Sequence, residues 1–228
     1  MTDQDAMKRQ AAEAAVAEVE DGMVLGLGTG STAALAVEAL AARVRRGLRV
    51  VGVPTSERTA AQAASLGIPL ADLGERPRLD LTIDGADEVH TGTLDLVKGL
   101  GGALLREKIV AASGRRMTVI VDESKLVDAL GARVRLPVEV VRFGWRATLE
   151  RLRDAGADPA LRGGPNEPFV TDGGNHIADC RFPAIPDPAA LHARLKALVG
   201  VVETGLFIGM ATRVVVGTPS GPRTLERV

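Results

Sequence analysis

The sequence predicts an α/β fold: a parallel-sheet, Rossmann-like domain with helices on both faces, and a smaller α+β, ferredoxin-like domain inserted into it. Short apolar runs alternate with helical patterns as far as Gly131, which is typical of a parallel sheet covered by helices. After Gly131 the order becomes strand, helix, strand, strand, helix, strand, the split pattern of ferredoxin-like domains. We expect the first domain at residues 1–132, the inserted domain at 133–204, and a return to the first domain at 205–228.

The elements of the first domain follow from hydrophobic periodicity. Amphipathic, often alanine-rich patterns predict helices at 5–21, 33–46, up to residue 65, and 103–112. Short runs rich in β-branched residues predict strands at 23–27, 48–53, 68–70, 79–83, 96–97, 117–121 and 214–216.

The inserted domain is predicted from shorter patterns. Strands are expected at 138–142, 160–162, 169–171, 176–180 and 201–203, and helices at 145–155 and 188–198. The run Asp172-Gly173-Gly174-Asn175 predicts a hairpin turn between two of those strands. The last six or so residues of the chain look loose.

Composition excludes several classes of partner. The net charge of −1 gives no electrostatic case for nucleic acid or an anionic membrane, and the lack of Tyr, with one Trp and four Phe, leaves few platforms for stacking bases. No apolar run is long enough to span a bilayer, and the polar start does not resemble a secretory signal. Cys180 is the only cysteine, and we interpret it as a small core residue. A cytoplasmic protein is expected.

A glycine turn, Gly28-Thr29-Gly30-Ser31-Thr32, follows the first predicted strand and opens a helix. This context suits an anion held by backbone N–H groups. A dinucleotide site is the weaker interpretation, because Ser31 occupies the third glycine position and no acid ends the second strand before Glu57. A purely structural turn is a further alternative, although it would not require the hydroxyls of this turn.

The stretch from Leu79 to Ser113 contains most of the candidate catalytic residues. Its first strand ends on Asp84-Gly85-Ala86-Asp87-Glu88, and a second apolar pair leads to Lys98 and a glycine-rich helix start. Ligands of open α/β sheets lie outside the carboxyl ends of the strands, so this grouping suits proton transfer on an anionic substrate. A turn with a helix cap remains an alternative for the acids. A divalent-metal site is another, with the possible ligands Asp84, Asp87, Glu88 and His90.

Glu107 lies about a turn and a half inside the helix that begins at the glycines, so its carboxylate points back toward that helix start. A solvated helix face, with Arg106 and Lys108 on either side, is the alternative. Lys98 and Lys125 each stand beside a strand end, where a compact ammonium can serve a ligand.

Taken together, the motifs resemble ribose-5-phosphate isomerase, type A. The resemblance runs in order from about Ala11 to Gly217. It rests on the glycine turn, on Asp84 to Glu88, on the run Lys98-Gly99-x-Gly101-Gly102-Ala103-Leu104-x-Arg106-Glu107-Lys108, on Asp122-x-Ser124-Lys125, on Leu136-Pro137-Val138-Glu139-Val140, and on Phe169-Val170-Thr171-Asp172-x-Gly174-Asn175.

The resemblance implies interconversion of ribose 5-phosphate and ribulose 5-phosphate without a metal or organic cofactor, by a homodimer or a dimer of dimers. It implies that Glu107 is the catalytic base, assisted by Asp84, Asp87 and Lys98. The residues implied to bind substrate are Thr29, Gly30, Ser31, Thr32, Asp84, Gly85, Ala86, Asp87, Lys98, Gly99, Leu100, Gly101 and Lys125, the last of these holding phosphate.

Leu100 departs from the family pattern by interrupting a run that is often all glycine. Leucine disfavours positive φ, so we expect Leu100 at negative φ, with its side chain turned from the sugar and packed on apolar neighbours. Two rival functions remain: a sugar-phosphate-sensing regulatory module, and a coenzyme A transferase relative that would use a glutamate as nucleophile.

Overall fold

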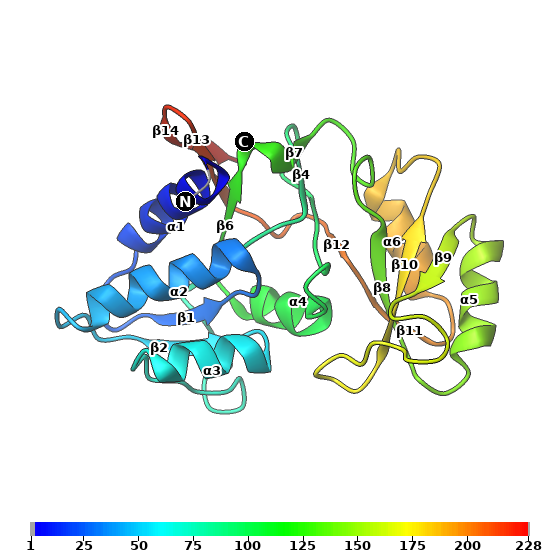
Figure 1. Cartoon of the computed structure of the whole chain (residues 1–228), viewed down its shortest axis with the longest axis horizontal. Coiled ribbons are helices and arrows are strands. Elements are labelled where there is room, and N and C mark those ends of the chain that lie inside the picture. The colour runs from blue at the N-terminus through cyan, green and yellow to red at the C-terminus, as the bar shows by residue number, and fades with distance from the viewer. Residues whose placement is uncertain (1–2, 228) are drawn as a thin grey trace. The chain divides into compact units, whose positions relative to one another are not determined.

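The computed structural model describes residues 3–227, which form two compact units (Figure 1). Of the described residues, the first unit contains 3–86, 106–125 and 209–227, and the second contains 87–105 and 126–208. These limits are not those drawn at 132/133 and 204/205, because the second unit also takes up 87–105 and 126–132. That residues 133–204 are an inserted folding domain stays a prediction.

The first unit is built on a six-stranded sheet with the order β14-β13-β6-β3-β1-β2. Its strands are β1 (Val24–Leu27), β2 (Val51–Pro54), β3 (Leu81–Asp84), β6 (Met117–Asp122), β13 (Arg213–Thr218) and β14 (Gly221–Glu226). All neighbouring pairs are parallel except β13 with β14. All six residues of β6 are buried, as expected for a strand covered on both faces.

Helices cover both faces of this sheet, as the fold class requires. They are α1 (Asp3–Ala17), α2 (Ser31–Val44), α3 (Glu57–Ser65) and α4 (Leu104–Ser113). Leu25 and Leu27 of β1 share a core with alanines and valines of α1 and α2, while Gly26 points to the other face, where an added Cβ would lie 2.6 Å from Val110 of α4. Alternate residues of one strand therefore pack under different helices.

The second unit contains the predicted ferredoxin-like motif. Its elements are β8 (Leu136–Val140), α5 (Trp145–Asp154), β9 (Asp158–Leu161), β10 (His176–Arg181), α6 (Pro188–Lys196) and β11 (Val201–Thr204). The antiparallel sheet has the order β11-β8-β10-β9. Cys180 lies in its core, and burial raises the pKa of the thiol to about 12, so the core interpretation of this cysteine is confirmed.

A third sheet, also in the second unit, has no counterpart among the predicted elements except residues 96–97. Its strands are β4 (Glu88–His90), β5 (Leu96–Val97), β7 (Leu126–Val127) and β12 (Leu206–Phe207), in the order β12-β5-β4-β7. These strands are two or three residues long, too short for a period of two to stand out. This sheet is important for the site because two predicted site residues adjoin its strands: Asp87 precedes β4 and Lys98 follows β5.

Three expectations about single elements are wrong. Residues 169–171 form no strand; β10 pairs with β9 instead, although the turn itself exists, with the Thr171 N–H donating to the Asn175 carbonyl at 2.9 Å. Residues 68–70 provide only a bridge from Leu70 to Gly52. The end of the chain is not loose through residue 226, because β14 pairs along its whole length with β13.

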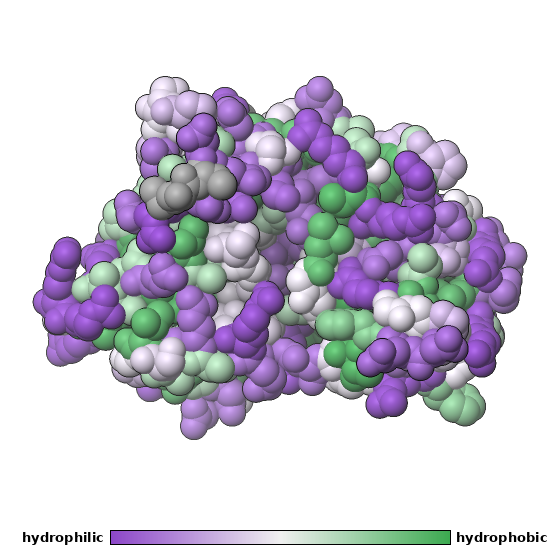
Figure 2. Space-filling view, in the orientation of Figure 1, coloured by the Kyte–Doolittle hydropathy of each residue, from purple (hydrophilic) through white to green (hydrophobic). Residues whose placement is uncertain are grey.

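The hydropathy of the surface is what we expect from a chain in which 25% of the residues are charged. The face shown in Figure 2 is mostly hydrophilic, and its apolar residues lie in small separate groups. Within residues 3–227, no helix is both long enough and apolar enough to cross a membrane.

Candidate active site

The order of the main sheet places a switch point between β1 and β3. From β1 the chain moves to β2 on one side, and then crosses to β3 on the other side. Ligands of open α/β sheets bind at such a reversal, beyond the carboxyl ends of the strands. The glycine turn follows β1 and Asp84 ends β3, and the two meet where the Gly28 N–H donates to the Ile83 carbonyl at 2.9 Å.

Asp84 fastens the glycine turn. Its side chain is fully buried, and Oδ1 accepts the N–H groups of Thr29 at 3.1 Å and Gly85 at 2.7 Å. A Cβ on Gly28 would lie 2.1 Å from the same oxygen, so only glycine fits there. The alternative of a turn with a helix cap is thus correct in part for Asp84. Its carboxylate accepts backbone N–H groups and so shapes two turns, and it also lies at the switch point of the sheet.

The Thr29 hydroxyl is used inside the protein. It lies 2.7 Å from the hydroxyl of Thr55, 2.8 Å from that of Ser56 and 3.0 Å from that of Thr59, and Thr59 also donates to the Gly28 carbonyl. This cluster was not predicted, although the run Thr55-Ser56-Glu57-Arg58-Thr59 directly after a strand was a signal for it. The Thr29 hydroxyl therefore ties the glycine turn to the start of α3, and the role of Thr29 in substrate binding stays a prediction.

The start of α2 has the backbone geometry that suits an anion. Gly30 has a φ of 124°, a value that favours glycine, and precedes the first helical residue, Ser31. The first N–H groups of a helix have no partner within it and attract anions. Ser31 is exposed and Thr32 is buried, so the turn presents its backbone and the Ser31 side chain.

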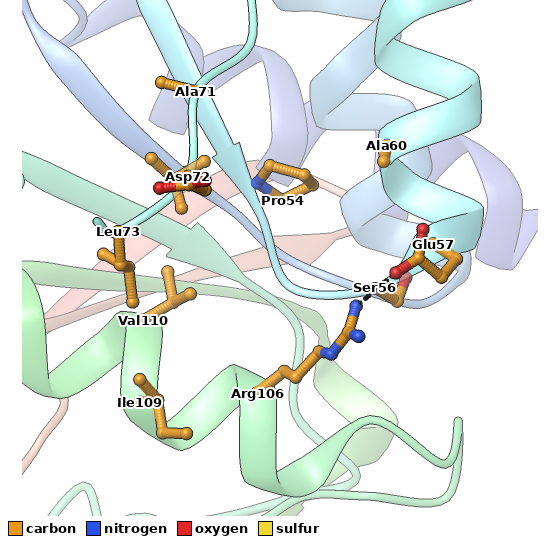
Figure 3. A pocket seen from close by; sticks show the side chains of 11 residues that line it. Pro54, Ser56, Glu57, Ala60, Ala71, Asp72, Leu73, Arg106, Ile109 and Val110 are labelled. Atoms are coloured by element: carbon orange, nitrogen blue, oxygen red, sulfur yellow. Dashed lines mark hydrogen bonds and ion pairs between the residues drawn. The ribbon is translucent and has the colours of Figure 1, made fainter. Parts of the chain in front are cut away.

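Glu107 lies in the first turn of α4, and its side chain is only 3% exposed. The solvated-face interpretation is therefore wrong for this residue. Its neighbour Arg106 takes the outer position, where Nη1 lies 2.7 Å from Oε1 of Glu57 at the start of α3 (Figure 3). That ion pair joins the starts of two helices at the carboxyl edge of the sheet.

A cavity of about 320 Å³ lies beside this ion pair (Figure 3). Its walls are mostly apolar, with Val53, Leu73, Ile109 and Val110 among them. Arg106 is the basic side chain in its lining, and it is already paired with Glu57. The cavity thus offers few donors for a sugar phosphate, in contrast to the glycine turn.

Lys125 ends the short 3₁₀ helix η1 (Glu123–Lys125), which follows β6. Because β6 is the neighbour of β3, Lys125 belongs to the same carboxyl edge as Asp84. Asp122 accepts both the backbone N–H (3.0 Å) and the hydroxyl of Ser124, which shapes the turn that carries the half-buried lysine.

The second unit holds the other two candidate groups, Asp87 and Lys98. Lys98 is 2% exposed; its backbone N–H donates to the Gly205 carbonyl at 2.8 Å, and its Nζ lies 5.4 Å from the centre of the Phe207 ring. Asp87 accepts the Leu100 N–H on Oδ2 at 2.9 Å. The short strands β5 and β12 therefore fix the lysine, and Asp87 fixes the loop that follows it.

Leu100 agrees with only part of the expectation. Its φ is not positive, as predicted. Its side chain, however, is 45% exposed, so the expected close packing on apolar neighbours is wrong. The N–H is occupied by Asp87.

Two of the four possible metal ligands, Glu88 and His90, instead accept hydrogen bonds from backbone N–H groups. Glu88 is fully buried and accepts the N–H groups of Gly131, Arg133 and Val134 at 2.5–3.0 Å. His90 accepts the Thr93 N–H on Nδ1 at 3.0 Å. Within the part of the chain that the structure describes, no three His, Cys, Asp or Glu residues are grouped to hold a metal ion.

The glycine turn at a switch point, the buried carboxylate at a helix start and the lysines next to strand ends are what we expect of an α/β enzyme that acts on a small anion by acid–base chemistry. The family model for ribose 5-phosphate isomerase A (phosphoriboisomerase A) matches residues 51–221. The chain belongs to this family and is an isomerase.

Curated relatives and solved structures match this chain over nearly its whole length. The ribose-5-phosphate isomerase A of Gloeobacter violaceus is 59% identical over 98% of this chain and 97% of its own, and that of a Synechococcus species is 56% identical over the full length of both. A solved D-ribose-5-phosphate isomerase in complex with phospho-erythronic acid is 42% identical, covers all of both chains, and has a TM-score of 0.95. The enzyme from Methanocaldococcus jannaschii, also 42% identical, covers 97% of this chain and 99% of its own with a TM-score of 0.93.

Proposed function

We propose that this chain interconverts D-ribose 5-phosphate and D-ribulose 5-phosphate through a cis-enediolate, in the non-oxidative pentose phosphate pathway, with Glu107 as the base. The observation that carries the proposal is the buried carboxylate of Glu107 in the first turn of α4. A carboxylate that is kept from bulk water at a helix start is suited to take and return a carbon-bound proton.

The chemistry assigns one role to each group. Glu107 removes the proton from C2 of the open-chain aldose, the electron pair forms the C1–C2 double bond, and the carbonyl oxygen becomes an enediolate oxygen. A proton then moves from O2 to O1, the same carboxyl returns its proton to C1, and the C2–O bond becomes the carbonyl of the ketose. Lys98 and backbone N–H groups of its loop stabilise the negative oxygen as charge develops.

Ring opening and phosphate binding use the remaining groups. Asp84 or Asp87 carries a proton between O1 and the ring oxygen before isomerisation. The start of α2 and Lys125 hold the phosphate, so that binding of the remote group positions C1 and C2. Chain connectivity supports joint action: Asp84 and Asp87 are three residues apart, and Lys98 leads directly through the glycine loop into α4.

An NMR assay tests the proposed function. Ribose 5-phosphate is incubated with purified protein in deuterated water, and the proton spectra of both sugars are followed. Ribulose 5-phosphate should form, and deuterium should enter at the carbons that exchange protons with Glu107. A protein that binds ribose 5-phosphate without forming ketose would support the sensing-module alternative, and a covalent thioester in intact-mass spectra would support the transferase.

We propose further that the protein works as a homodimer, with a dimer of dimers as the larger assembly. An exposed apolar group supports self-association: Phe143 is 94% exposed, Val199 is 77% exposed, and Val141, 41% exposed, bonds to the residue after Val199. Light scattering should give twice or four times the chain mass, and Phe143→Ser should lower it. A monomer mass for the wild-type protein would refute the proposal.

A cytoplasmic location also stays a prediction of the composition. It is tested by fractionating cells that express the chain with its own termini and assaying each fraction for isomerase activity. Activity recovered mainly with membranes or outside the cell would contradict it.

A further inference from the structure

The loop from Lys98 to Gly102 has a shape that its own sequence does not determine. It contains three glycines, and Gly99 and Gly102 have φ values of 111° and 85°. Glycine populates both signs of φ readily, so such a loop needs partners that select one conformation. In the proposed reaction this loop supplies Lys98 and backbone donors, so its conformation matters for the chemistry.

Arg162, directly after β9, is one such partner. Its Nη1 donates to the carbonyl oxygens of Gly99 at 3.0 Å and Leu100 at 3.1 Å. The rest of the guanidinium is held by Asp179 of β10, through Nε at 2.9 Å and Nη2 at 2.5 Å. Both side chains are mostly buried, and the two-point pair leaves the arginine little freedom.

Phe169 completes the clamp. The Arg162 guanidinium carbon lies 5.8 Å from the centre of the Phe169 ring. The same ring covers Gly102, where an added Cβ would lie 2.5 Å from a ring carbon. Arg162 and Phe169 therefore contact the two ends of the glycine segment, and all of these residues belong to one compact unit.

The carbonyl contacts determine where two N–H groups point. In a trans peptide, the carbonyl and the following N–H face opposite ways. The Gly99 carbonyl points to Arg162, so the Leu100 N–H points away from it, and there it reaches Asp87. By the same rule the Gly101 N–H points away from Arg162. Gly101 is exposed, and no hydrogen bond of its N–H is found within residues 3–227.

We propose that Arg162, held by Asp179, is a positioning residue that orients two peptide units of the loop. One unit keeps the Leu100 N–H on Asp87, and the other directs the Gly101 N–H to an oxygen of the enediolate. This inference rests on the proposed function. Arg162 itself contacts loop carbonyls and not the reacting atoms.

Arg162→Lys is the first test, because lysine keeps the charge but cannot hold Asp179 at two points while donating to two carbonyls. An oxyanion donor acts mainly in the transition state, and losing one outright costs about a hundredfold or more in kcat. A displaced donor should lower kcat by roughly 10–100-fold while KM changes less than about threefold. Arg151→Lys, on the exposed surface of α5, is the matched control and should stay within twofold.

An NMR readout separates this role from a general loss of structure. Proteins labelled with ¹⁵N-glycine are titrated with phospho-erythronic acid, and the Gly101 signal is assigned with Gly101→Ala, which is permitted because Gly101 does not have positive φ. The Gly101 resonance should shift on binding in the wild type and shift much less in Arg162→Lys.

The outcomes are decisive in each case. A wild-type protein without isomerase activity removes the proposed function. An active wild type, with Arg162→Lys within twofold in kcat and an unchanged Gly101 shift, removes the role of Arg162. If Arg162→Lys does not fold by circular dichroism, Asp179→Asn replaces it, and it should lower kcat in the same direction; an unchanged kcat there refutes the clamp.

Discussion

Replacing Gly28 by alanine should disrupt the switch point, because the new Cβ would lie 2.1 Å from Oδ1 and 2.5 Å from Cα of Asp84. Backbone as well as side chain must therefore move, and the hydrogen bond from the Thr29 N–H to the buried carboxylate cannot survive unchanged. A hydrogen bond to a charged group contributes about 1.5–3 kcal/mol, and overpacking costs about 1–3 kcal/mol. If both contributions apply in full, the free energy of unfolding should fall by about 2.5–6 kcal/mol.

Gly85→Ala is the matched control for this substitution. Gly85 also adjoins Asp84, but its φ is not positive and the nearest atom to an added Cβ is the Ile120 carbonyl oxygen at 3.8 Å. Urea unfolding should place it within about 1 kcal/mol of the wild type. Equal stability of Gly28→Ala and Gly85→Ala would refute the claim that Asp84 and the turn are packed against each other.

Three further predictions concern other groups. Burial, with a smaller contribution from the charge of Glu203, raises the pKa of Glu139 in the folded protein, so the stability linked to its protonation is complete below the unfolded pKa and is lost as pH rises through the raised value. In unfolding measured against pH, Glu139→Gln should remove this decline; a difference between variant and wild type that does not vary with pH would contradict it. Lys125→Ala should raise KM far more than it lowers kcat, since a phosphate contact is largely uniform binding; a collapse of kcat alone would place Lys125 at the reacting end. Cys180 should not react with a thiol reagent at pH 8 until the protein unfolds, because its thiol is buried and its pKa is about 12; rapid labelling of folded protein would show otherwise.

Five of the six strands of the main sheet, all except β14, and the elements of the ferredoxin-like motif could be predicted from the sequence, because they form apolar runs or helical patterns bounded by turn residues. β6 and β10 have six residues each, and α5 and α6 have apolar positions three and four apart. The sheet of β4, β5, β7 and β12 could not be predicted in this way, because pairing among distant two-residue strands leaves almost no local pattern.

The candidate site likewise contains residues that local sequence motifs predict and residues that only the tertiary structure reveals. Asp84, Glu107 and the glycine turn stand in local motifs, next to strand ends or helix starts that can be recognised from the sequence. The cluster of Thr55, Ser56 and Thr59 around Thr29 depends on a neighbouring strand, and Arg162 reaches a loop about sixty residues away. Such contacts follow from tertiary packing, which a single sequence does not display.

Glu107→Gln gives the most direct test of the proposed mechanism. The variant should fold as the wild type does by circular dichroism, lose at least about a thousandfold in kcat, and stop the exchange of the C2 proton of ribose 5-phosphate in deuterated water. Glu13→Gln, an exposed position on α1, should leave both rates unchanged. Near wild-type turnover and exchange in Glu107→Gln would contradict the assignment of Glu107 as the base.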